Sequence, residues 1–156
     1  MEDQFLAKIV RNGWKLEEAS AFNDVNGAPL HAIPDDLRKF LASYGTLTNA
    51  RETTWLNSAQ DFASKSTGGF SWNEFELISL AAAEGNDTWR QEVQAFWSSH
   101  LPILMSVEGH YEYVAYCSAG NNDGLYVQGS EPEFEHVKVV AASLAGFKSW
   151  LLSNAA

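Results

Sequence analysis

The chain has 156 residues, of which 46% are hydrophobic and 19% are charged. This length and balance predict one folded domain over residues 1–156 and exclude a chain that is disordered by composition. Twenty Asp and Glu against ten Lys and Arg give a formal net charge of −10, which opposes binding to nucleic acid or to an anionic membrane and favours a basic partner.

The first part of the chain is predicted to form helices with one extended segment between them. Apolar residues recur at helical spacing over residues 5–10, and Gly13 can end that helix. A weaker helix is expected over 15–25, and two prolines favour an extended segment over 28–33. The clearest helix begins at Pro34 and has one apolar stripe, made of Leu37, Phe40, Leu41 and Tyr44.

Shorter elements are predicted between residues 46 and 100. Residues 53–56 favour a strand, and Ser58 can open a short helix that reaches residue 64. Residues 74–80 mix Phe, Leu and Ile side chains and are expected to form a strand. A helix is expected from about residue 88 to residue 98, because Thr88 and Gln91 fit a capping box.

The last third of the chain is predicted to be a series of strands closed by a helix. The strands are expected at 103–107, 110–118, 125–129 and 137–142, with the Gly- and Asn-rich segment 118–124 as a hairpin turn. Ser143 can cap the final helix, whose inward side chains are expected to be Leu144, Phe147, Trp150 and Leu151. The fold class is therefore α+β, with an antiparallel sheet of about five to six strands.

The histidines and the single cysteine are the first candidates for catalysis or metal binding. His110 and Cys117 lie seven residues apart on one predicted strand, and an odd offset places them on opposite faces. We therefore expect no dyad there, and Cys117 is expected to be a core residue. The remaining histidines lack the spacing of metal ligands and are expected at the surface or at caps: His31, His100 and His136. No cofactor or metal is predicted.

Carboxylates are the other candidates for acid–base chemistry. Glu108 with Glu112, or Glu131 with Glu133 and Glu135, are spaced closely enough to share a site. Catalysis would also require a cleft that shifts their pKa values, and an acidic loop that runs into a strand is usually just solvated. We therefore expect no enzyme.

The sequence also bears on the compartment. One cysteine excludes an internal disulfide, and residues 1–12 lack the basic and apolar regions of a signal peptide. No apolar run approaches the roughly 18 residues of a membrane span. A cytoplasmic protein is expected.

Three motifs resemble the SUKH superfamily. Residues 33–45 (IPDDLRKFLASYG) resemble its opening signature, 72–77 with 101–104 resemble its middle strands, and 147–152 (FKSWLL) is similar to its last helix. The resemblance covers roughly residues 15–153 and depends on the order and spacing of short motifs. The chain departs from the family's pattern at Tyr44–Gly45, where Asn-Gly is commoner, and at Gly109–His110, where Gly-Asp is often found.

The resemblance implies a twisted antiparallel sheet flanked by helices, without catalysis or cofactor. Many bacterial members are immunity proteins encoded beside polymorphic toxins, which are often nucleases, and a fungal branch regulates cell-wall synthesis through protein contacts. We therefore expect an immunity protein that neutralises a basic toxin domain. A general protein-interaction scaffold is the alternative, and a small ligand-binding protein or enzyme is the third.

A nuclease holds nucleic acid with Lys and Arg, so its active cleft is positive. An acidic chain can be attracted into such a cleft and block it with carboxylates, while one or two aromatic anchors hold the complex. The residues predicted to bind the partner are acidic side chains on expected loops and hairpin edges together with two aromatic anchors: Glu108, Asp123, Glu131, Glu133, Glu135, Tyr126 and Trp72.

Overall fold

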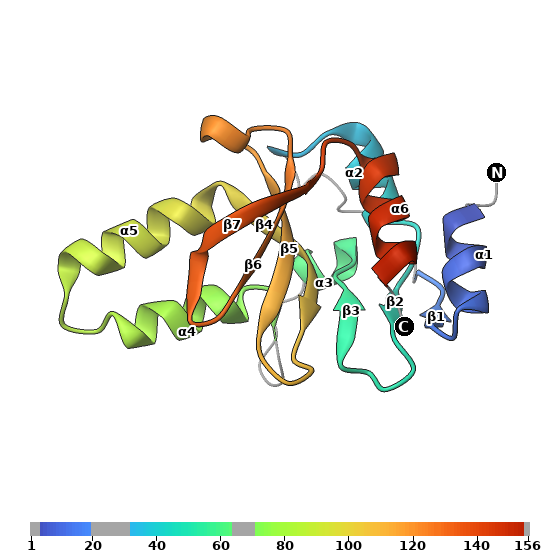
Figure 1. Ribbon diagram of the computed structural model, residues 1–156, viewed down its shortest axis with the longest axis horizontal. Coiled ribbons are helices and arrows are strands. Elements are labelled where there is room, and N and C mark those ends of the chain that lie inside the picture. The colour runs from blue at the N-terminus through green and yellow to red at the C-terminus, as the bar shows by residue number, and fades with distance from the viewer. Residues whose placement is uncertain (1–3, 20–31, 64–70, 155–156) are drawn as a thin grey trace.

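One antiparallel sheet organises the computed structural model, which describes residues 4–19, 32–63 and 71–154 (Figure 1). Within these residues the sheet has seven strands in the order β1-β2-β3-β4-β5-β6-β7, so each strand pairs with its neighbour in sequence. The strands are β1 Lys15–Glu17, β2 Thr46–Thr48, β3 Thr54–Leu56, β4 His100–Ser106, β5 Glu112–Cys117, β6 Tyr126–Ser130 and β7 Glu133–Ala141. The predicted α+β class is confirmed, with one or two strands more than expected.

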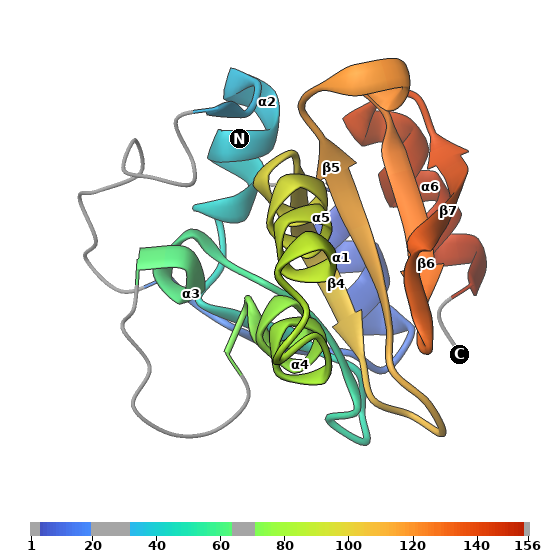
Figure 2. The ribbon, with the colours of Figure 1, turned by 90° about the vertical axis from the view of Figure 1, so that its left-hand side faces the viewer.

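Helices cover both faces of this sheet. They are α1 Gln4–Arg11, α2 Asp35–Leu41, α3 Ala59–Ala63, α4 Glu74–Ala82, α5 Asp87–Ser98 and α6 Leu144–Asn154. We call the face under α1, α2 and α6 the first face, and the face under α4 and α5 the second face (Figures 1 and 2). Each face of the sheet has its own hydrophobic core, and β5 contributes side chains to both. Val114 and Tyr116 pack on the first face, and Tyr113 and Ala115 pack on the second.

Several predicted elements are confirmed by the structure. The helix over residues 5–10, the helix after Pro34 and the strand at 53–56 are present as α1, α2 and β3. Ser143 accepts a hydrogen bond from the Gly146 N–H at 3.0 Å, so it opens α6 as expected. Three of the four inward residues predicted for α6 are buried, and Trp150 is half-buried.

Two predicted elements are wrong. Lys15–Glu17 is a strand rather than a helix, because its backbone pairs with Thr46–Thr48 at the edge of the sheet. Residues 20–25 of that predicted helix and residues 28–31 of the predicted extended segment lie outside the described residues. Segment 74–80 is helical rather than extended, since Phe75 and Ser79 are buried one turn apart and α4 packs beside α5.

The start of α5 also differs from the prediction. The helix begins at Asp87, and Asn86 is its N-cap, with the side-chain oxygen accepting the Trp89 N–H at 3.0 Å. Thr88 therefore lies inside the first turn and does not form the predicted capping box with Gln91. Asn is as good an N-cap as Ser or Thr, and the Gly85–Asn86 pair that precedes α5 was the better signal.

Asn57 joins three elements at the end of β3. Its backbone N–H donates to the Ile103 carbonyl at 2.9 Å, and its side-chain amide donates to the Pro102 carbonyl at 2.9 Å, both on β4. Its carbonyl oxygen accepts from the Tyr44 hydroxyl at 2.7 Å, beyond the end of α2, and its side-chain oxygen accepts from Trp55 Nε1 at 3.2 Å. Burial raises the pKa of Tyr44 well above its ordinary value, so the hydroxyl keeps its proton and can donate.

We predict that Asn57→Ala lowers the free energy of unfolding by about 2–3 kcal/mol, because it leaves Trp55 Nε1 and the Pro102 carbonyl without their partner in a buried site. Urea denaturation followed by circular dichroism measures this. The matched control is Asn121→Ala in the exposed turn 120–122, where a change below about 0.5 kcal/mol is expected. Equal effects of the two substitutions would contradict the role of Asn57.

Candidate functional site: an acidic sheet end and a polar hollow

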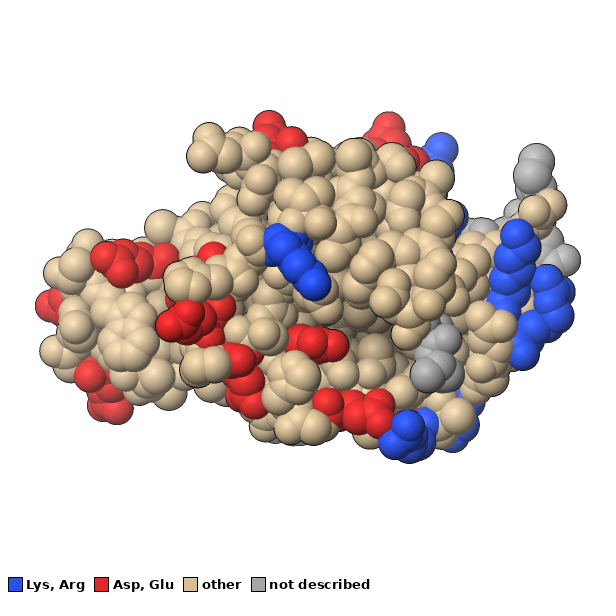
Figure 3. Space-filling view, in the orientation of Figure 1, with Lys and Arg blue, Asp and Glu red and all other residues tan. Residues whose placement is uncertain are grey.

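The net charge is concentrated in one continuous part of the chain. Residues 71–137 contain eleven of the twenty Asp and Glu but only one Lys or Arg, Arg90. The net charge of −10 therefore lies within this segment, and the rest of the chain is balanced. The segment forms α4, α5, β4 to β6 and the start of β7. In Figure 3 most acidic side chains lie on the left and lower parts of the molecule, with a few at the top, while a group of basic ones lies at the right over α1 and a few others at the centre, the top and the lower edge.

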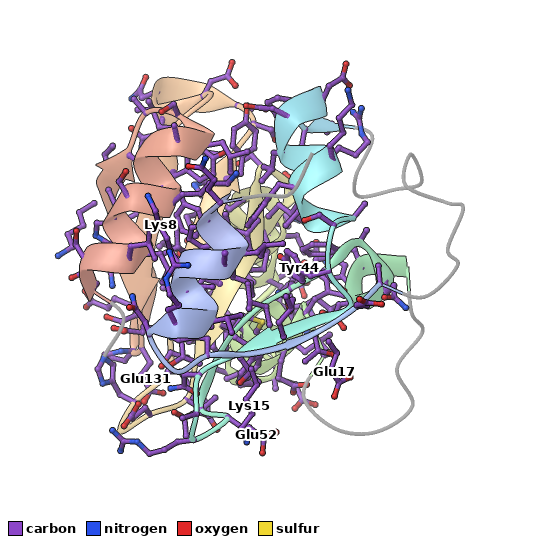
Figure 4. All side chains as sticks on the ribbon, turned by 90° about the vertical axis from the view of Figure 1, so that its right-hand side faces the viewer. Lys8, Lys15, Glu17, Tyr44, Glu52 and Glu131 are labelled. Carbon is purple, nitrogen blue, oxygen red and sulfur yellow. The ribbon has the colours of Figure 1, made fainter. Side chains whose placement is uncertain are left out.

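Four of the predicted partner-binding carboxylates come from two adjoining turns. Glu108 lies in the β4–β5 turn, Glu131 lies in the β6–β7 turn, and β7 begins with Glu133 and continues through Glu135. The Glu131 side chain accepts the Tyr111 N–H at 3.1 Å, and the Glu131 N–H donates to the Tyr111 carbonyl, so the two turns are joined. Figure 4 places Glu131 at the lower end of the sheet, below α6. We call Glu108, Glu131, Glu133 and Glu135 the acidic end.

Close packing on the second face fixes the start of β7. The Tyr113 ring lies against Gly129, where an added Cβ would come within 2.5 Å of the Tyr113 hydroxyl. That hydroxyl donates to the carbonyl of Phe134, whose side chain is buried between Glu133 and Glu135. Burial raises the pKa of Tyr113, and the charge of Glu135 raises it further, which shows that this carboxylate is near. Glu133 and Glu135 are thus exposed on either side of the buried Phe134.

Basic side chains neutralise little of the acidic end. Arg51 pairs with Glu108 at 2.6 Å, and His136 lies 2.6 Å from Glu133. Among the described residues, no Lys or Arg lies within ion-pair distance of Glu131, Glu133 or Glu135. These exposed carboxylates are therefore available to a partner.

The other three predicted residues lie elsewhere. Asp123 lies between β5 and β6 at the opposite end of β5, which at six residues places it roughly 20 Å from the acidic end. Tyr126 is 2% exposed and stacks on Phe147 with ring centroids 5.4 Å apart, so it is a core residue and no surface anchor. Trp72 is half-buried against Phe62, with ring centroids 5.3 Å apart.

A row of polar residues crosses the first face next to the acidic end. Thr54, Ser106, Glu112 and Ser130 are register partners on β3, β4, β5 and β6. Thr54 and Ser106 are joined by a hydrogen bond of 2.9 Å between their hydroxyls. The helices of the first face leave a hollow of about 340 Å³ over this row, whose other walls include Trp14, Gln128, Trp150 and Asn154.

This hollow was not predicted from the sequence, although a signal for it exists. On β5 the side chains that point to the first face are Glu112, Val114 and Tyr116. The position at the start of this row is therefore a carboxylate, although the next two are buried core residues. The same change from apolar to polar occurs between Leu104 and Ser106 on β4. Polar residues at the end of a core-facing row indicate that no helix covers that part of the sheet.

Among the described residues, the three histidines and Cys117 form no comparable site, and His31 lies outside the described ranges. His110 lies in the turn before β5 and Cys117 lies buried at the far end of that strand. His100 stacks on Phe96 and its Nδ1–H donates to the Phe96 carbonyl at 2.7 Å, while burial lowers its pKa. It therefore caps the end of α5. In the described part of the chain, no three or more His, Cys, Asp or Glu are grouped to hold a metal ion.

No helix in the described ranges has the length and apolar character needed to cross a membrane. No family model, curated protein or solved structure matches this chain. Its function is therefore inferred from its own surface and from the resemblance of its motifs.

We predict that removing two charges from the acidic end stabilises the protein at low salt. In Glu133→Gln with Glu135→Gln, relief of like-charge repulsion should raise the free energy of unfolding by a few tenths of a kcal/mol at about 10 mM salt, and by almost nothing at about 300 mM. Thermal unfolding at the two salt concentrations measures this. Glu17→Gln with Glu18→Gln, in the balanced part of the chain, is the matched control and should give no comparable gain. Equal gains in both variants would contradict a local concentration of charge.

Proposed function

We propose that this chain is an immunity protein that acts in the cytoplasm by binding and neutralising the basic toxin domain of a nuclease. The observation that carries the proposal is the concentration of the whole net charge in residues 71–137, with four exposed carboxylates on two adjoining turns and the start of β7. Such a surface matches a positively charged cleft better than it matches any anionic partner.

The mechanism follows from electrostatics. A nuclease cleft binds phosphates with Lys and Arg, and the carboxylates of the acidic end present similar negative charge on the rigid turns of a sheet. The attraction guides the two proteins together and raises their association rate, and the rate falls as salt screens the field. Once bound, the sheet end occupies the space of the nucleic acid and so prevents catalysis.

The resemblance to the SUKH superfamily supports the same proposal at two of its three motifs. Residues 33–45 include α2 and residues 147–152 lie in α6, so the opening signature and the last helix are helical as the family pattern implies. Segment 101–104 lies in β4, but segment 72–77, which resembles a family strand, leads into α4. The support therefore comes from the two ends of the domain and from the antiparallel sheet between them.

We predict that charge reversal in the acidic end slows association with the toxin. The partner to test is a basic domain encoded by a gene that sequencing finds next to that of this chain, and biolayer interferometry measures both rate constants. Glu133→Lys with Glu135→Lys should lower the association rate constant by roughly tenfold or more at low salt and much less at high salt. Glu131 is left unchanged because its carboxylate also accepts the Tyr111 N–H.

Glu17→Lys with Glu18→Lys changes the net charge equally and is the matched control. If only total charge matters, both variants slow association equally and the acidic end is not the binding surface. If neither slows it, electrostatic guidance is excluded. If the neighbouring basic domain does not bind and the tagged chain instead captures a housekeeping assembly, the protein is a scaffold module and the immunity proposal fails.

A further inference from the structure

We propose that the hollow on the first face is a binding pocket for a single arginine side chain of the partner protein. The identity of the partner rests on the function proposed above, whereas the chemistry of the pocket does not. The hollow, of about 340 Å³, lies between the polar row of the sheet and the end of α6. It is distinct from the acidic end, although Glu108 belongs to both.

Hydrogen-bond acceptors line the floor of the pocket. Glu112 is one-third exposed, and its carboxylate lies 3.2 Å from His110 Nε2. Gln128 on β6 is the register partner of Val114, and its side-chain amide oxygen offers a second acceptor. The side-chain nitrogen of Asn154 is used in a hydrogen bond to the Trp150 carbonyl at 2.7 Å, so its oxygen is the group left to accept. A ligand with several donors is favoured by this set.

Aromatic side chains form the opposite wall. Trp150 is half-buried on α6, where its ring stacks on Phe147 at a centroid distance of 6.1 Å and an interplanar angle of 22°. Trp14 is 4% exposed, and its Nε1 has no hydrogen-bond partner among the described residues. A planar guanidinium can stack on an indole ring while its edge donates in a fork to carboxylates and amides, whereas an ammonium has no planar face to stack and no such fork. The aliphatic part of an arginine side chain suits the apolar Leu104 and Leu151 that complete the lining.

The charges around the pocket also favour a cation. Arg51 lies at the rim, but its charge is matched by Glu108 at 2.6 Å, and this pair shows that a guanidinium and a carboxylate meet here. Glu112 then supplies a negative charge that, among the described residues, has no Lys or Arg within ion-pair distance. Lys138, the register partner of Gln128 on β7, lines a neighbouring hollow together with Glu112 and His136. Lys138 is a positive charge near Glu112, so it weakens the negative field of the pocket.

The experiment uses the folded chain and needs no toxin. The probe is N-acetyl-L-arginine methylamide, titrated into the ¹⁵N-labelled protein and followed by NMR, with the indole N–H signals of Trp14 and Trp150 as reporters. The citrulline analogue, which has the same shape but no charge, and the lysine analogue are the comparison probes. Saturable shifts are expected with the arginine probe at concentrations on the order of millimolar. The citrulline probe should bind roughly tenfold or more weakly.

Two isosteric substitutions keep the test independent of folding. Glu112→Gln should weaken binding of the arginine probe roughly tenfold, and Gln128→Glu should strengthen it several-fold. Glu84→Gln, an exposed carboxylate after α4, changes the net charge as Glu112→Gln does and should leave binding unchanged. Equal shifts with arginine and citrulline probes, or equal binding by Glu112→Gln and Glu84→Gln, would overturn the proposal. Tighter binding of the lysine probe would overturn the assignment to arginine.

These outcomes are distinguishable from failure of the immunity proposal. If the arginine probe binds but the neighbouring basic domain does not, the pocket stands and the proposed partner is wrong. If the basic domain binds and charge reversal at Glu133 and Glu135 slows it, while the arginine probe gives no saturable shift, only the pocket is lost. When both hold, Glu112→Gln should raise the dissociation rate constant of the complex roughly tenfold and leave the association rate constant nearly unchanged.

Discussion

The buried amide of Asn57 sets the position of β3 against β4, and much of the functional surface depends on that register. Its backbone and side chain both donate to β4, at Ile103 and Pro102, where the β4–β5 register shifts between Pro102 and Leu104. Because every polar part of Asn57 has a partner, its burial is compatible with stability, and a shift by one residue would leave several groups unsatisfied. The register it holds pairs Thr54 with Ser106, which begins the polar row.

The strands form a simple antiparallel meander, so the register set between β3 and β4 also fixes which residues pair on the strands that follow. Each strand pairs with the next, so a polar side chain at the end of one core-facing row falls beside polar side chains on its neighbours. The helices of the first face pack on the apolar part of these rows, which includes Val114 and Tyr126, and leave a hollow between the polar part and the end of α6. The same strands end in the two turns that hold the acidic end. The same end of the sheet therefore carries both the acidic end and the polar hollow.

Secondary structure could be predicted from the sequence where the apolar pattern was long or where a capping residue marked the start of a helix. The helix after Pro34 has an apolar stripe and acidic residues at its start, and α6 has a Ser cap, so both were identified with nearly correct bounds. Three-residue strands such as Thr46–Thr48 are too short to show alternation. Segment 74–80 was predicted to be a strand because its apolar residues fit either period, and only packing beside α5 decides for a helix.

Some residues of the candidate site were predicted from the sequence, because acidic side chains mark exposed turns. Turns expose acidic side chains, so Glu108, Glu131 and Glu133 were placed at hairpin ends from sequence alone, but which ends meet depends on strand order. Asp123 was grouped with them because sequence does not show that its turn lies at the far end of β5. Tyr126 was taken as an anchor because a tyrosine suits both a core and an interface, and only its stacking on Phe147 assigns it to the core.

The acidic end and the pocket would contribute to different stages of binding. Exposed carboxylates act over about a Debye length and so affect how fast two proteins meet, but each exposed pair adds little to the lifetime of a complex. A guanidinium enclosed between Trp150 and Glu112 contributes in the opposite way, because a desolvated and charge-assisted contact mainly slows dissociation. An inhibitor of a toxin needs both a fast encounter and a long-lived complex, since free toxin acts during any delay. Because the two features are adjacent at one end of the sheet, the side chains proposed to attract a basic surface would also direct one of its arginines into the proposed pocket.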